Sequence, residues 1–176
     1  VIPCRANCVT GLMRLTSSDS VTGFSAGADP ISGNATFQDN ASKKFLYIDL
    51  AYGRWYALNT PEWTTALTVG KRGNPFVFSD LVFDGDYTPE GIALQAGYTI
   101  NDQHSLKLSS AFFALDEINQ GIQASDDPTF LGAQLRFDSK WTPKLSTTAG
   151  VAFMTLTDVQ NLTSGAVPNI NSGNNR

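Results

Sequence analysis

The sequence Gly91-Ile-Ala-Leu-Gln-Ala-Gly-Tyr-Thr-Ile-Asn-Asp-Gln-His-Ser-Leu-Lys-Leu-Ser109 decides the fold class. Apolar residues alternate with small or polar residues up to Ile100 and again from Ser105. Between the two runs, Asn101-Asp102 supplies the residue types that favour a turn. A two-residue period is that of a β-strand with one apolar face, so this stretch predicts an antiparallel hairpin with a short turn. His104, beside that turn, is expected to be a solvent-exposed polar residue.

The same alternation recurs along the chain and predicts an all-β protein. The expected strands cover residues 9–16, 45–56, 63–71, 91–100, 105–115, 130–138 and 145–156. Several reach about 9 to 12 residues, close to the roughly 9 to 11 tilted residues that cross a bilayer and longer than ordinary soluble strands. In 45–56, one face is assigned Leu46, Ile48, Leu50 and Tyr52, and the polar face Tyr47, Asp49, Ala51 and Gly53.

The connections between these strands alternate between long and short. The long ones are 17–44, 72–90 and 116–129, and the short ones are 57–62, 101–104 and 139–144. Short turns at one rim and long loops at the other are typical of outer-membrane barrels, whereas Greek-key sandwiches do not sort their loops in this way. Aromatic residues expected at the membrane interface lie beside the short turns: Trp55, Tyr56, Trp63, Tyr98 and Trp141. Others fall at the long-loop rim: Phe45, Phe112, Phe113, Phe130 and Phe153.

Composition excludes several classes of protein. The 176 residues include 12 Lys and Arg against 16 Asp and Glu, and a net charge of −4 argues against nucleic acid as a partner. One histidine and two cysteines are too few ligands for most metal sites built from these residues. No catalytic or cofactor-binding residues stand out. Cys4 and Cys8 are either unpaired thiols or a small local disulfide. No apolar run approaches the roughly 18 residues of a spanning helix.

Two series of motifs resemble a known family. The first is Gly11-Leu-Met-Arg-Leu-Thr16 followed by Ala41-Ser-Lys-Lys-Phe-Leu-Tyr-Ile-Asp-Leu-Ala-Tyr52. The second is Gly70-Lys-Arg-Gly-Asn-Pro-Phe76, then Asp80-Leu-Val-Phe-Asp-Gly-Asp86 and Pro89-Glu-Gly91. In their order and spacing they resemble the "putative porin" family of bacterial outer-membrane barrels. The resemblance implies a water-filled diffusion pore in the outer membrane of a Gram-negative bacterium, with no catalytic residues.

The polar faces of the expected strands supply the candidate pore-lining residues. These are Arg14, Asp49, Arg72, Gln95, Lys107, Gln134, Arg136 and Asp138. The arginines could set ion selectivity or could pair with acidic neighbours across the wall. A cluster of carboxylates marks the 72–90 connection: Asp80, Asp84, Asp86 and Glu90. It is expected to be a solvated acidic loop, and whether it folds into the lumen is left open.

The sequence therefore predicts an antiparallel up-and-down transmembrane β-barrel that works as a porin and not as an enzyme. Residues 1–176 are expected to form part of a single barrel domain, with an irregular segment at 1–8 and a long loop or truncated end at 157–176. Because bacterial barrels close with an even number of strands, further strands are expected beyond the seven. The expected partners are outer-membrane lipids, small hydrophilic solutes or ions, and further copies in a homo-oligomer. The alternatives are a soluble secreted or periplasmic β-sandwich that binds carbohydrate or an envelope component, and a non-conducting structural barrel.

Overall fold

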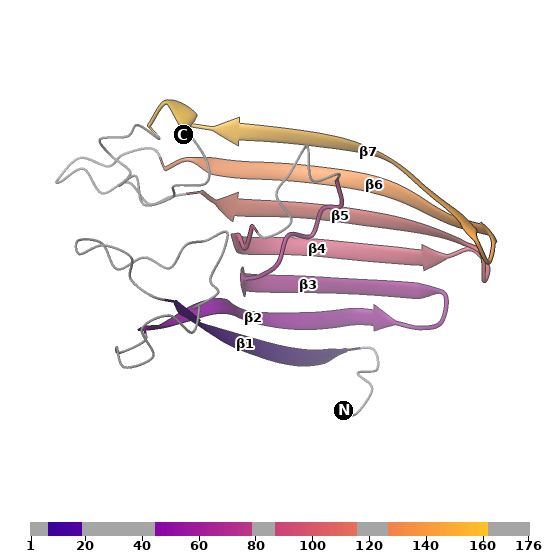
Figure 1. The fold of residues 1–176 in the computed structure, drawn as a ribbon, viewed down its shortest axis with the longest axis horizontal. Helices are drawn as coiled ribbons and strands as arrows, with labels where there is room; N and C mark the ends of the chain where they lie inside the picture. The colour runs from indigo at the N-terminus through magenta and orange to yellow at the C-terminus, as the bar shows by residue number, and fades with distance from the viewer. Residues whose placement is uncertain (1–6, 19–44, 79–86, 116–126, 162–176) are drawn as a thin grey trace.

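The computed structural model describes residues 7–18, 45–78, 87–115 and 127–161. They form one open sheet of seven antiparallel strands in sequence order, as Figure 1 shows. The strands are β1 (Cys8–Ser18), β2 (Phe45–Asn59), β3 (Trp63–Lys71), β4 (Glu90–Thr99), β5 (His104–Ala114), β6 (Thr129–Thr142) and β7 (Leu145–Thr157), followed by the short 3-10 helix η1 (Val159–Asn161). The seven strands expected from the sequence and their up-and-down order are confirmed. Among the described residues no helix is long and apolar enough to cross a membrane.

The register explains why the alternation is easy to follow in the middle of the chain and misleading near its start. From β3 to β6 the strands pair without interruption. In β2, Leu50 pairs with Arg14 but Ile48 pairs with Leu15, so Asp49 is an extra residue in a β-bulge. A one-residue slip moves all later side chains to the opposite face. The face assignment in β2 is therefore wrong from Leu50 onward: Leu50 and Tyr52 lie on the inner face, and Ala51 and Gly53 lie on the outer face.

Two faces of different chemistry result from this register. The outer face carries apolar side chains in cross-strand rows: Val69, Ile92, Phe112 and Leu131 in one row, and Leu108, Leu135 and Val151 in another. These side chains are exposed, with Val151 at 71 %. Exposed apolar rows of this extent need another apolar phase or partner against them.

The inner face is polar along most of its length but has an apolar cluster near the long-loop rim. Phe113 of β5 and Phe130 of β6 pair across the two strands, and their rings stack at 5.8 Å. Phe76, from the connection after β3, packs on the edge of Phe130 with ring centroids 5.7 Å apart. Ala93 and Ala111 complete the cluster. Phe113 and Phe130 lie at the long-loop rim as expected, but the expectation that they join an aromatic belt at the membrane interface is wrong, because both are buried on the inner face while Phe112 points outward.

Two facing glycines permit the close approach of strands next to this cluster. Gly70 and Gly91 pair across β3 and β4, and their φ angles are 119° and 150°. A Cβ on Gly91 would lie 2.2 Å from the carbonyl oxygen of Phe112. Glycine is required at Gly91 by both the backbone conformation and the contact.

The short-turn rim is held by aromatic contacts. The rings of Trp63 and Tyr98 lie 4.4 Å apart. His104 is partly buried: its Nδ1 lies 2.8 Å from Ser139 Oγ, and its ring stands 5.3 Å from that of Trp141. The expectation that His104 is simply solvent-exposed is wrong, because β6 brings Ser139 and Trp141 against it.

At the start of β1, Cys8 is in a disulfide. The other cysteine of the chain, Cys4, lies outside the described residues. Of the two sequence interpretations, the disulfide is therefore the one that agrees with the structure.

Candidate functional site

The first part of the connection between β3 and β4 lies on the inner face of the sheet. In Figure 1 this connection crosses in front of β4 and β5. Its contact with β6 is specific: Val77 N donates to Gln134 Oε1 at 3.0 Å, and Gln134 Nε2 donates to Val77 O at 2.8 Å. Together with the packing of Phe76, these two bonds fasten residues 72–78 across the polar side of the sheet.

The local sequence of this segment explains its shape. The Asn74 side chain accepts a hydrogen bond from Phe76 N at 3.0 Å, which forms a turn around Pro75. The turn directs the Phe76 ring at Gly132 of β6, where an added Cβ would lie 2.8 Å from Phe76 Cζ. Gly132 thus makes room for the ring that anchors the segment.

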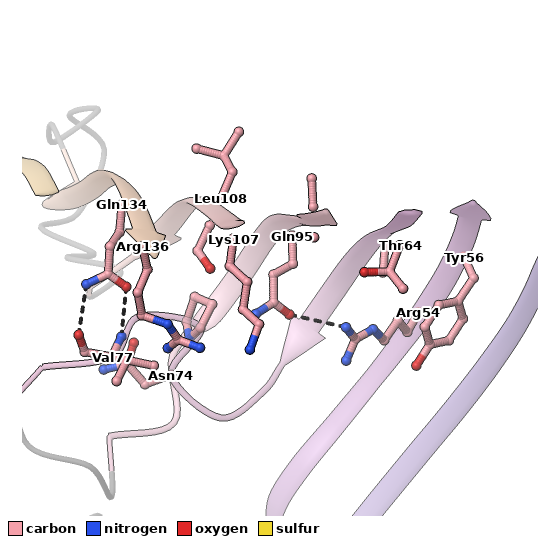
Figure 2. Close-up of a pocket in the computed structure, with 15 residues that line it drawn as sticks. Arg54, Tyr56, Thr64, Asn74, Val77, Gln95, Lys107, Leu108, Gln134 and Arg136 are labelled. Atoms are coloured by element: carbon pink, nitrogen blue, oxygen red, sulfur yellow. Dashed lines mark hydrogen bonds between the residues drawn. The ribbon is translucent and has the colours of Figure 1, made fainter. Parts of the chain in front are cut away.

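Between this segment and the strands lies a cavity of about 320 Å³. Figure 2 shows the side chains of Arg54, Gln95, Lys107, Gln134 and Arg136 projecting to one side of the sheet and that of Leu108 to the other. Gln134 is bonded to Val77 at one end of the cavity, and Arg54 is bonded to Gln95 at the other. The charged residues that line it are Arg54, Lys107 and Arg136. No carboxylate is among the described residues that line the cavity.

Arg54 and Arg72 share one neutral acceptor. Their Nη2 atoms donate to the same oxygen, Gln95 Oε1, at 3.3 and 3.0 Å. Arg54 Nε and Arg72 Nη1 are buried and have no hydrogen-bond partner among the described residues. Burial lowers the pKa of Arg72, and the positive charge of Arg54 lowers it further. Within the described part of the chain, two positive charges therefore lie close together without the carboxylate partner that buried arginines ordinarily have.

Lys107 and Arg136 belong to a second group nearer the short-turn rim. Both contact Asp138, with Lys107 Nζ at 2.8 Å and Arg136 Nε at 3.0 Å from its carboxylate oxygens. Thr148 Oγ1 donates to the same carboxylate at 3.0 Å. Lys107 and Asp138 also line a wider hollow of about 550 Å³ at that rim. One carboxylate therefore compensates two cations, which leaves this part of the face positive.

The candidate residues from the sequence fall into three positions. The cross-strand register places Arg14, Gln95, Lys107, Gln134, Arg136 and Asp138 on the inner face, and Arg72 follows β3 at the end of that face. Asp49 reaches the same side from the bulge and forms an ion pair with Arg14. Glu90 lies elsewhere: it pairs with Lys71 at 3.3 Å on the outer face. Asp80, Asp84 and Asp86 lie outside the described residues.

Sequence reasoning missed Arg54 and misplaced Tyr56. Both lie on the inner face, where the Arg54 guanidinium stands 5.0 Å from the centre of the Tyr56 ring. Tyr56 therefore does not accompany its neighbour Trp55, which is exposed on the outer face. The bulge at Asp49 explains both errors, since it breaks the period from which the faces of β2 were read.

An open up-and-down sheet with an apolar outer face, a charged inner face and a connection packed over the inner face is consistent with a fragment of a porin-like barrel. Comparison with protein families agrees, because the family described as "putative porin" matches residues 9–175. The chain belongs to this family. No curated protein and no solved structure matches it.

Proposed function

We propose that this chain forms part of the wall of an outer-membrane porin, a water-filled channel through which small hydrophilic solutes or ions diffuse passively. The two-sided sheet supports this proposal. Its apolar outer rows suit lipid chains, and its inner face carries charged and amide side chains that suit water.

One observation carries the proposal: residues 72–78 are fastened to the inner face. Gln134 holds Val77 by two hydrogen bonds, and the segment borders a cavity lined by cations. Such an arrangement would narrow an aqueous lumen without filling it. In a β-sandwich, a second sheet would be expected to cover the opposite, apolar face of this sheet.

The aromatic residues at the short-turn rim suit a position at the level of the lipid headgroups. Trp141 Nε1 donates to Thr147 Oγ1 at 2.9 Å, and Trp63 and Trp141 both expose about half of their surface. Amphipathic rings of this kind favour membrane interfaces. The partners that this proposal implies are outer-membrane lipids on one face and dissolved solutes on the other.

The test is single-channel recording of the full-length protein in planar lipid bilayers. Discrete conductance steps that scale with bulk electrolyte at low voltage are the expected result. A protein that folds and inserts but gives no channels would overturn the porin function and leave a structural barrel. Recovery of the protein in the soluble periplasmic fraction would contradict the membrane location itself.

A further inference from the structure

We infer that the cavity at Arg54 binds a small oxyanion, a carboxylate or a phosphate, and that this site makes the proposed channel select for anionic solutes. This inference rests on the proposed function and names its class of solute. On the described part of the inner face, positive side chains outnumber carboxylates.

On the described part of the inner face, three cations have a carboxylate partner. Arg14 has Asp49, and Lys107 and Arg136 share Asp138. Arg54 and Arg72, by contrast, form no ion pair with any described residue and meet on the amide oxygen of Gln95. The positive charge without a carboxylate is therefore concentrated at one place, where β2, β3 and β4 lie side by side.

The hydrogen-bonding groups at that place match an oxyanion. Arg54 Nε is buried but donates no hydrogen bond to any described residue. A buried N–H without a partner costs free energy, and a charged acceptor is the group that relieves this cost most strongly. The planar guanidinium presents its donors in a fork that fits the oxygens of carboxylate or phosphate.

The rest of the cavity favours an anion over a cation or a neutral sugar. Lys107 and Arg136 add positive charge on the opposite side, and no carboxylate among the described lining residues would attract a cation. Thr64 and Asn74 supply neutral polar groups at its edge. A volume of about 320 Å³ suits a small solute with its water better than an oligosaccharide.

Gln95→Glu is the sharpest test, because it changes the amide between the two arginines into a carboxylate of the same shape. The new carboxylate would pair with Arg54 and Arg72 and compete with a bound anion. In the full-length protein, we expect single-channel current carried by acetate or by inorganic phosphate to saturate with concentration. We expect Gln95→Glu to remove that saturation and to weaken binding at least about tenfold.

Isothermal titration of the detergent-solubilised protein with acetate and with phosphate gives a second readout that does not depend on conduction. Saturable binding of either anion supports the site, and the tighter of the two identifies its chemistry. Gln103→Glu is the matched control, because it makes the same charge change at an exposed turn residue outside the cavity. It should leave binding unchanged.

The outcomes separate this inference from the proposed function. Channels whose current does not saturate with either anion, together with no heat of binding, would overturn the oxyanion site and leave the porin intact. Saturable binding without channels would support the site and overturn the porin. Equal loss of binding in Gln95→Glu and Gln103→Glu would show that the effect is one of net charge and would overturn the site.

Discussion

At the scale of single residues, Gln134 and Gly91 shape the inner face. Gln134 uses both ends of its amide to hold the backbone of Val77, so the position of residues 72–78 depends on one side chain of β6. Gly91 lets β4 and β5 approach where no Cβ would fit. Neither residue is charged, yet Gln134 positions a segment that borders the cavity, and Gly91 allows the close strand approach beside the apolar cluster.

Replacing Gln134 with Leu should release the segment and widen the path over the inner face. Leu keeps the volume but loses both hydrogen bonds and leaves the Val77 groups unpaired, at a cost of about 1–3 kcal/mol. We expect larger single-channel conductance and a lower midpoint of urea unfolding. Gln103→Leu, at an exposed turn, is the control, and unchanged conductance in Gln134→Leu would contradict the constricting role of the segment.

Replacing Gly91 with Ala should destabilise the sheet by more than about 2 kcal/mol, since it adds a clash to a backbone conformation that only glycine adopts readily. The measurement is the free energy of unfolding in urea. Gly53→Ala is its control because nothing lies within 4 Å of an added Cβ there. Equal stability of the two variants would show that the backbone at Gly91 relaxes freely.

At the scale of elements, each strand separates two environments. β6 shows this most clearly: Leu131 and Leu135 are exposed on one face, while Gln134 and Arg136 face the cavity. β7 follows with Val151 outward and Ala152 inward, paired with Leu135 and Gln134. The same strand pair therefore offers adjacent positions for testing which face meets lipid.

The proposed function places Leu135 on a lipid-facing surface, so Leu135→Arg should weaken folding into lipid vesicles by about 2–4 kcal/mol, the cost of a charge facing lipid near the bilayer centre. Ala152→Arg places the same residue on the inner face, at an exposed position of the neighbouring strand, and should cost much less. Equilibrium unfolding from vesicles measures both. A larger loss for Ala152→Arg would reverse the assignment of the faces.

At the scale of the whole molecule, the sheet is open. Within the described residues β1 and β7 are its two edges, and each pairs with one neighbouring strand. Unpaired backbone groups are not tolerated in a bilayer, and exposed edges invite association with other strands. We therefore propose that further strands complete a closed barrel.

Closure predicts a specific behaviour of the full-length protein on gels. A closed barrel resists detergent, so an unheated sample should migrate differently from a boiled one, and the protein should be found in the outer-membrane fraction. Identical migration of both samples, from protein that is folded by circular dichroism, would contradict a closed barrel.

Much of the fold could be predicted because strand alternation is a local property. Gly91–Ser109 shows it on both sides of one short turn, and the strands and their order followed from such stretches. The inner-face positions of Lys107, Gln134 and Arg136 followed in the same way. The site was predicted less completely. The bulge at Asp49 exchanges the two faces of β2 after that residue, so the sequence pattern did not place Arg54 on the inner face.

The sequence by itself determined that this protein is an antiparallel sheet of long strands with an apolar and a polar face, because a period of two residues assigns side chains to faces without reference to anything distant. Only the tertiary structure decided that residues 72–78 lie on the polar face and that Arg54 and Arg72 meet on Gln95. Those contacts join residues 57, 41 and 23 positions apart, and pairing at such separations depends on register and packing that no local pattern contains.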